Sequence, residues 1–215
     1  MHKPSRPEDL DRPELLWARA VTLAVLDAAC GDRTEFAVDD DGVWCHSTGA
    51  GGWWRLSVLD GPRAVLCGQD PDGSHTHVGG RQVDFLAGGP DWLPWDLLRE
   101  DADGNLLGFV YWWQDGAWHR IPYPDELPED GLDGAAPWAG SHEEFLELAV
   151  DSRDVPYERR RTLTEAVGRF VETARERRAD EAAVAALLAP AQAVQGPAPR
   201  PGVALALAAR AGILA

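Results

Sequence analysis

The sequence predicts an α+β fold, with a mostly antiparallel sheet of about six strands, helices packed around it and a helical C-terminal extension. Short β-branched and aromatic segments between residues 35 and 121 are joined by turn residues, which indicates strands connected as a meander. Helical periodicity dominates residues 141–189. An apolar segment rich in alanine and leucine ends the chain at 203–215.

The domain organisation is predicted from changes in composition along the chain. We expect one compact domain over residues 13–189, with its sheet region at about 35–121 and helices at 141–189. Residues 190–202 are rich in proline and glycine, which favours a linker. Residues 203–215 are expected to form an apolar terminal helix, too short to cross a membrane, that docks on its own domain or on another subunit.

The first predicted element is a helix that begins at Pro13 and ends at about Cys30. Proline suits the first helical turn, and the carboxylate of Glu14 is favourable at that end of the helix dipole. Gly31 follows as a stop signal. The segment is apolar nearly all round, so the helix is expected to be buried.

The first half of the sheet is predicted from four short segments with turn sequences between them, an arrangement typical of antiparallel neighbours. The expected strands are Glu35–Asp39, Val43–Ser47, Trp53–Leu59 and Arg63–Gly68. The elements expected next are a loop over Gln69–Gly80, a short strand or helix start over Val83–Leu86, a helix over Asp91–Arg99 and a turn over Asp101–Asn105.

A β-hairpin is predicted at Leu106–Ile121, and the rest of the chain is expected to be organised around it. Its first strand is apolar on both faces, so other elements must cover both faces and the strand is expected to be central. Asp115 and Gly116 suit the positive φ angles of a tight turn. The return strand is more polar and stops before Pro122, so it is expected nearer the sheet edge.

Helices are predicted for most of the C-terminal third. Ser141 and Glu144 have the spacing of a capping box, which starts one helix. A long helix is expected over Tyr157–Arg178, with an i,i+4 pair between Glu165 and Arg169 on its exposed side. The alanine-rich segment that follows, up to residue 189, is also predicted to be helical.

The net charge is −16 and is unevenly distributed. Residues 1–150 hold 28 acidic and 10 basic side chains, a net charge of −18, whereas residues 151–215 hold 8 acidic and 10 basic ones. Such an acidic body repels phosphate backbones, which argues against nucleic-acid binding, and it attracts basic proteins or cations. The alternative is that the acidity only keeps a tryptophan-rich protein in solution.

The three cysteines form no CxxC pair, so the sequence predicts buried thiols in a reducing cytoplasm and neither a disulfide framework nor a zinc knuckle. The N-terminus lacks an apolar signal segment, and no apolar run reaches the length of a membrane span. A cytoplasmic protein without a membrane partner is therefore expected. Nineteen arginines against one lysine, and a single asparagine, are typical of a GC-rich bacterial genome.

Two groups of residues were weighed as reactive sites. His75 and His77, next to carboxylates, have metal-ligand chemistry, but such a pair in a loop is usually a solvated turn. Cys45, beside His46 and with His119 elsewhere, has the residue types of a nucleophile and base, but Cys45 alternates with Trp44 and is expected to face the core. Common catalytic motifs are absent, so no catalytic residue, metal ligand or cofactor is predicted.

The predicted partner-binding site combines aromatic and acidic residues. One sheet face is expected to carry Trp53, Arg55, Trp112 and His119, residue types that often anchor protein interfaces. The alternative is that the tryptophans form two core layers, one on each side of the sheet. A nearby acidic loop is expected to steer a basic partner through Asp125, Glu126, Glu129 and Asp130.

Three functions are compatible with these observations. The first is a non-enzymatic, acidic protein-binding module, for example an inhibitor or immunity-type protein that neutralises a basic partner. The second is a small-molecule- or metal-binding enzyme with a pocket on one sheet face. The third is a structural subunit that forms a homo-oligomer through its C-terminal helix.

Overall fold

A computed structural model describes residues 1–31, 35–46, 51–104, 107–193 and 197–215. Parts of four predicted segments lie outside the described residues. These are Ser47 in the second predicted strand, Asn105 in the predicted turn, Leu106 at the start of the hairpin and residues 194–196 of the predicted linker.

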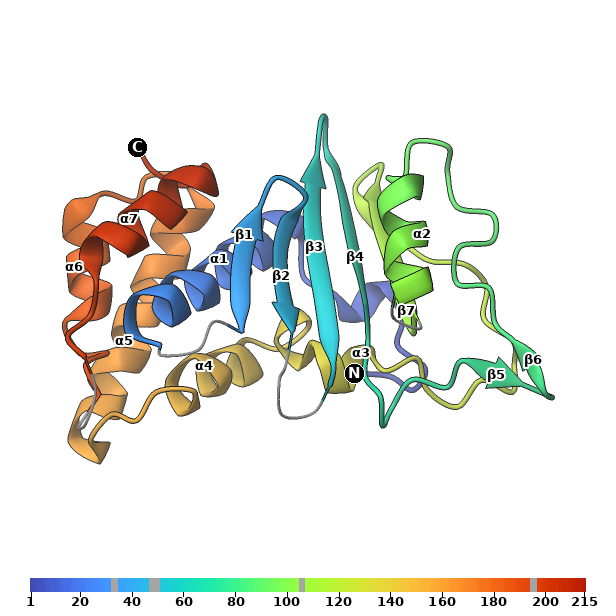
Figure 1. The fold of residues 1–215 in the computed structure, drawn as a ribbon, viewed down its shortest axis with the longest axis horizontal. Helices are drawn as coiled ribbons and strands as arrows, with labels where there is room; N and C mark the ends of the chain where they lie inside the picture. The colour runs from blue at the N-terminus through green and yellow to red at the C-terminus, as the bar shows by residue number, and fades with distance from the viewer. Residues whose placement is uncertain (32–34, 47–50, 105–106, 194–196) are drawn as a thin grey trace. The chain divides into compact units, whose positions relative to one another are not determined.

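The predicted α+β fold is confirmed, because the described strands form a six-stranded antiparallel sheet in the order β1-β2-β3-β4-β7-β8 and are accompanied by helices (Figure 1). The strands of this sheet are β1 (Phe36–Asp39), β2 (Gly42–His46), β3 (Trp53–Leu59), β4 (Arg63–Gln69), β7 (Phe109–Gln114) and β8 (Ala117–His119). A separate two-stranded ribbon consists of β5 (His77–Val78) and β6 (Arg81–Gln82).

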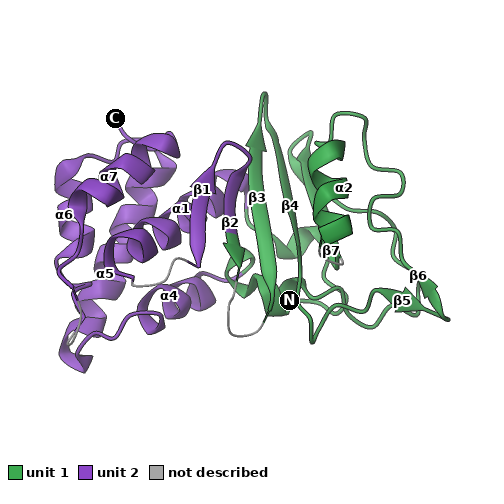
Figure 2. Cartoon of the chain, in the orientation of Figure 1, with its two compact units in different colours: residues 1–11, 45–140 green, residues 12–44, 141–215 purple. Residues whose placement is uncertain are grey.

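The chain is divided into two compact units (Figure 2). Unit 1 comprises residues 1–11 and 45–140, and unit 2 comprises residues 12–44 and 141–215. Unit 1 contains the short helices η1 (Pro7–Asp9), α2 (Trp95–Gly104), α3 (Leu132–Ala135) and η2 (Pro137–Ala139). Unit 2 contains α1 (Pro13–Cys30), α4 (His142–Asp151), α5 (Tyr157–Arg175), α6 (Glu181–Leu188) and α7 (Pro201–Arg210).

One face of the unit 1 sheet is covered by α2 and the chain before it. The core on this side contains Trp53 of β3, Val65 of β4 and Val110 of β7, and the ladder registers place all three on the same face of the sheet. Phe85 and Leu98 pack over these strand residues. Apolar side chains on this face are therefore removed from water by elements that precede the hairpin in the chain.

The opposite face of the same strands is also buried. Trp54 of β3 packs against Trp138 of η2, with ring centroids 4.7 Å apart. Tyr111 of β7 is fully buried, and its hydroxyl oxygen lies 2.9 Å from the backbone oxygen of Ser5. Adjacent residues such as Trp53 and Trp54 thus contribute one ring to each face, as the alternation of a strand requires.

The hairpin prediction holds for its turn, for its covered faces and for the edge position of the return strand. Asp115 and Gly116 have φ angles of 52° and 82°, and β8 is the last strand of the sheet. The expectation of a central first strand is wrong, because β7 lies next to that edge. Burial of both faces does not require a central strand, because neighbouring strands cover the edges of a strand and not its faces. The faces of β7 are covered by elements packed on the sheet, which are α2 with the chain before it on one side and the N-terminal segment on the other.

Unit 2 is a helical body built around α1, which is buried along almost its whole length as predicted. It packs against α5 and α7, so the C-terminal helix docks on its own chain. The Trp17 indole donates a hydrogen bond to the Ala211 backbone oxygen at 3.1 Å. At the other end of α1, the Asp27 carboxylate accepts hydrogen bonds from the backbone of Phe36 and from the Arg153 guanidinium.

Several predicted element boundaries differ from the structure. The predicted helix over Asp91–Arg99 is displaced, because α2 begins only after Pro94, whose backbone oxygen accepts the hydrogen bond of Leu98. The residue before a proline disfavours helical angles, which explains the later start. Residues 101–104 form the last turn of α2 and not the predicted turn. Residues 83–86 form neither a strand nor a helix.

The C-terminal helices follow the predictions closely. The Ser141 hydroxyl caps α4 by accepting the backbone hydrogen bond of Glu144 at 3.2 Å. The long helix ends at Arg175, a few residues earlier than predicted. The ion pair described in this helix joins Glu165 to Arg161, one turn before it, whereas the prediction paired Glu165 with Arg169, one turn after it.

Candidate functional site

The β7–β8 hairpin places three polar and aromatic side chains on one face at the edge of the unit 1 sheet. Trp112 is directly opposite His119 in the ladder, and Gln114 lies two residues from Trp112, so all three point to the same face. The two-residue turn at Asp115 and Gly116 fixes this register, because positive φ angles at both positions match the twist of the strands.

Trp112 and His119 form the first contact of this site. Their rings are nearly parallel, with an interplanar angle of 20° and centroids 6.3 Å apart. Trp112 is half-buried against the core, whereas His119 is exposed. The His119 Nε2 atom lies 3.2 Å from the backbone oxygen of Gln114. An imidazole that reaches solvent is therefore held against an indole that is anchored in the core.

Trp92 and Arg63 form the second contact. The Trp92 indole N–H donates a hydrogen bond to Gln114 Oε1 at 2.7 Å, and Gln114 in turn donates to the Asp115 carboxylate at 3.0 Å. The guanidinium carbon of Arg63 lies 5.0 Å from the centre of the Trp92 ring, a cation–π distance. We call the five residues Arg63, Trp92, Trp112, Gln114 and His119 the aromatic edge.

The aromatic edge combines anchored rings with accessible polar groups. Arg63 and His119 are exposed, whereas Trp92, Trp112 and Gln114 are half-buried. Both indoles pack against the unit 1 core, which reduces the entropy that they lose when a second molecule covers them. Preorganised aromatic side chains beside an arginine are the residue types that dominate the binding energy of protein interfaces.

Two residues predicted for the partner-binding face lie deeper in unit 1. Trp53 is on the same sheet face as Trp112, but it is 5% exposed and belongs to the core under α2. The guanidinium of Arg55 lies 3.4 Å from the carboxylate of Asp101 on α2. Trp112 and His119 remain accessible at the edge, whereas α2 and the chain before it cover the middle of this face.

The predicted acidic loop is divided in the same way. Asp125 and Glu126 are exposed, whereas Glu129 forms an ion pair with Lys3 at 2.8 Å. Asp130 is completely buried. The exposed pair is accessible to solvent, and the other two carboxylates hold the N-terminal segment against the rest of unit 1.

The Asp130 carboxylate is the centre of a buried hydrogen-bond network. It accepts hydrogen bonds from the hydroxyls of Tyr111 and Tyr123 at 2.8 and 3.1 Å, and from the backbone N–H of Ser5 at 3.2 Å. Burial is the largest cause that raises the pKa of Tyr111 and of Tyr123. The neighbouring Tyr123 and then the negative charge of Asp130 raise the pKa of Tyr111 further, and Asp130 does the same for the pKa of Tyr123. Both phenols therefore remain protonated donors, which is what a buried carboxylate requires.

The residues considered as reactive groups differ in their accessibility. Cys45 and Cys67 are buried, and burial raises the pKa of Cys67, so its reactive thiolate form is disfavoured. His75 and His77 are exposed and lie near a backbone oxygen and a threonine hydroxyl, respectively. No group of three or more potential metal ligands occurs among the residues that the structure describes.

Three members of the aromatic edge were not predicted as site residues. Arg63 is the first residue of β4 and Gln114 is the last residue of β7. The antiparallel register brings these two ends together, one step beyond the pairing of Ala64 with Trp113. Trp92 was assigned to a helix, although it lies in the irregular chain before α2. The pairing of β4 with β7 skips the whole segment between them, so sequence spacing gives no signal for this contact.

Comparisons of the chain with protein families, with curated proteins and with solved structures give no significant match. Among the described residues, no helix combines the length and the apolar character needed to cross a bilayer.

Proposed function

We propose that this chain is a non-catalytic binding module for a basic protein, and that it neutralises its partner as an inhibitor or immunity-type protein does. The observation that carries the proposal is the aromatic edge, where two core-anchored tryptophans remain half-exposed beside an exposed arginine and histidine. Buried core tryptophans are common, whereas a group of partly exposed ones joined by polar contacts favours an interface.

The charges around the aromatic edge support a basic partner. Asp91 and Asp115 are exposed and are chain neighbours of Trp92 and Gln114, and Asp60 is exposed in the turn that precedes Arg63. Unit 1 as a whole contains 18 acidic and 7 basic side chains. An apolar centre with a charged rim is the usual anatomy of a protein interface, and here the rim is negative.

The two parts of the site are expected to act on different rate constants. Exposed carboxylates such as Asp125 and Glu126 accelerate association with a basic partner, and this effect decreases as salt screens the field. The packed rings control dissociation, because a partner must expose them to water again when it leaves. Truncation of a central anchor typically weakens binding by about 2 kcal/mol, which is roughly 30-fold.

To test the proposal, the full chain is immobilised and exposed to a native lysate of the source cells. Each basic protein that it captures is then purified. Binding is then measured by surface plasmon resonance at low and high salt. We expect His119→Ala and Arg63→Ala to accelerate dissociation several-fold, since both side chains are exposed and their loss leaves the core intact. His142→Ala, an exposed histidine of unit 2, is the matched control and should bind as the wild type does.

The electrostatic part has its own matched pair of variants. Asp125→Asn/Glu126→Gln should slow association several-fold at low salt. Glu143→Gln/Glu144→Gln removes the same charge from two exposed positions of α4 and should have a much smaller effect. Recovery of no basic partner, or equal dissociation rates for His119→Ala and His142→Ala, would refute the proposal.

A further inference from the structure

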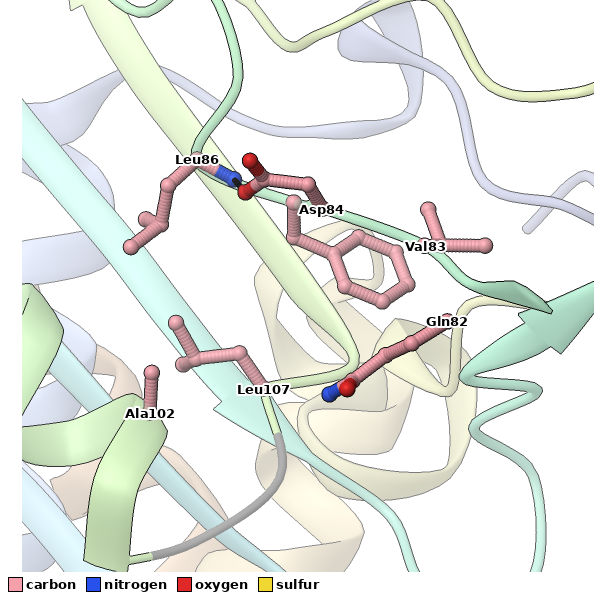
Figure 3. A pocket seen from close by; sticks show the side chains of 7 residues that line it. Gln82, Val83, Asp84, Leu86, Ala102 and Leu107 are labelled. Atoms are coloured by element: carbon pink, nitrogen blue, oxygen red, sulfur yellow. Dashed lines mark hydrogen bonds between the residues drawn. The ribbon is translucent and has the colours of Figure 1, made fainter.

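Unit 1 contains a cavity of about 310 Å³ between the chain that follows β6 and the end of α2 (Figure 3). Five of its lining residues are apolar and two are polar. The lining consists of Gln82, Val83, Asp84, Phe85, Leu86, Ala102 and Leu107. The volume is at the lower end of the range of small-molecule sites, about 300–1,000 Å³, and an apolar lining with few polar groups is typical of such sites.

The inner wall of the cavity is part of the folded core. Phe85 and Leu107 are 4% and 6% exposed and both belong to the unit 1 core cluster. Ala102 faces them from α2, and its methyl group leaves space that a larger side chain would fill. The apolar wall is therefore supported from behind and does not depend on a ligand to keep its shape.

Two polar groups stand at the mouth of this cavity. Figure 3 shows the Asp84 carboxylate beside Leu86 and the Gln82 amide near Leu107. Asp84 Oδ1 accepts the backbone hydrogen bond of Leu86 at 3.0 Å, which orients the carboxylate. The second carboxylate oxygen of Asp84 makes no hydrogen bond within the described part of the chain, so it can accept a hydrogen bond from a bound molecule.

The charge around the mouth indicates the sign of the ligand. Asp84 is the only charged residue among the described residues that line the cavity, and the exposed Asp103 follows Ala102 on α2. The basic residues in the neighbourhood are Arg81, which precedes Gln82, and Arg99, whose guanidinium lies over the Trp95 ring. A lining whose only charged side chain is a carboxylate favours a cation, and the surplus of acidic residues in unit 1 acts in the same direction.

We propose that this cavity binds a small organic cation, in which an amine is attached to an apolar body. The cavity volume allows about ten non-hydrogen atoms, because each water-sized group occupies roughly 30 Å³. The apolar body contacts Phe85, Leu86 and Leu107, and the ammonium group donates a hydrogen bond to the free oxygen of Asp84. The Gln82 amide oxygen is a second acceptor at the mouth. This inference is independent of the partner proposed for the aromatic edge.

The experiment uses the full chain with 13C-labelled methyl groups and three probes of similar shape: phenethylamine, neutral 2-phenylethanol and anionic phenylacetate. Chemical shifts are followed by NMR up to about 10 mM probe, because a fragment of this size binds in the millimolar range. We expect phenethylamine to shift the methyl signals of Leu86, Ala102 and Leu107. It should bind about fivefold more tightly than the alcohol, the upper range for an ion pair near the surface.

Two variants separate the cavity from nonspecific binding. Asp84→Asn should reduce the preference for the amine over the alcohol to less than twofold while the alcohol still binds. Ala102→Leu fills the cavity and should abolish the shifts for both probes, whereas Ala185→Leu, the same change at an exposed position of α6, should preserve them. Absence of methyl shifts with every probe, tighter binding of phenylacetate, or unchanged binding in Ala102→Leu would overturn the proposal.

Discussion

Substitution Tyr111→Phe tests whether the Asp130 carboxylate stabilises the fold of unit 1. The sequence instead predicts Asp130, like the acidic residues near it, as part of a partner-binding loop. The variant keeps the buried ring and removes one hydroxyl, which lies 2.8 Å from the Asp130 carboxylate and 2.9 Å from the Ser5 backbone oxygen. A hydrogen bond to a buried charge contributes about 1.5–3 kcal/mol. The remaining donors to Asp130 cannot replace it, so we expect a loss of about 2 kcal/mol in the free energy of unfolding.

Urea unfolding followed by tryptophan fluorescence measures this loss, because eight of the ten tryptophans belong to unit 1. Tyr123→Phe is the matched control. Its hydroxyl is 3.1 Å from the same carboxylate oxygen and the residue is half-buried, so we expect a cost of about 1 kcal/mol. In the background of Asp130→Asn, Tyr111→Phe should cost about 1 kcal/mol, less than in the wild type, because the hydroxyl then loses only neutral acceptors.

The pH dependence gives an independent check on the same network. Burial raises the pKa of Tyr111 above its ordinary value of 10.0, so the folded state retains a proton that the unfolded state releases in alkali. The wild type therefore loses stability as the pH rises above 10.0, whereas Tyr111→Phe lacks this contribution. The deficit of the variant should be constant near neutral pH and shrink by about 1.4 kcal/mol by pH 11. A deficit below about 0.5 kcal/mol at neutral pH would refute the assignment of Asp130 as a structural centre.

Three further predictions follow from single sites. Gly168→Ala should stabilise unit 2 by about 0.5–1 kcal/mol in thermal or urea unfolding, because this position in α5 has open space for a methyl group. Burial raises the pKa of Asp9, but hydrogen bonds from backbone N–H groups and from His2 have the larger combined effect and lower this pKa below 3.8. Asp9→Asn should therefore destabilise the chain at neutral pH, and the variant should match the wild type in acid, below the pKa of Asp9 in the folded state. A disulfide reagent should modify half-buried Cys30 before the fully buried Cys67, as mass spectrometry of the native protein can measure.

Local rules explain most of the secondary structure that could be predicted. The helix from Pro13 to Cys30 was predicted with both ends, because its start and stop signals and its apolar surface agree. The turn at Asp115 and Gly116 and the cap at Ser141 are also local chemistry. The apolar periodicity around Pro94 predicts a helix that begins at Asp91, but Pro94 disfavours helical angles in the residue before it. The helix α2 therefore begins after this proline, later than predicted.

The composition of the candidate site required long-range information. Alternation placed Trp53 and Trp112 correctly on one sheet face, but alternation does not say which part of that face another segment covers. The irregular chain around Phe85 buries Trp53 and leaves Trp112 at the margin. Likewise, four acidic residues in one loop look equivalent in the sequence, and only the tertiary position of Tyr111 reveals that Asp130 is an internal acceptor.

The shape of the sheet edge also determines how a partner can bind there. An exposed edge strand can recruit another strand through its backbone, but β8 has only three residues and Pro122 follows soon after it. Trp118 on this strand is buried and donates its indole hydrogen bond to the Asp11 backbone oxygen at 2.7 Å, which holds the N-terminal segment beside the edge. Strand addition is therefore disfavoured, and we expect the proposed partner to contact the side chains of the aromatic edge. A partner that binds this way should be sensitive to His119→Ala and indifferent to substitutions that alter only β-propensity at Ala117.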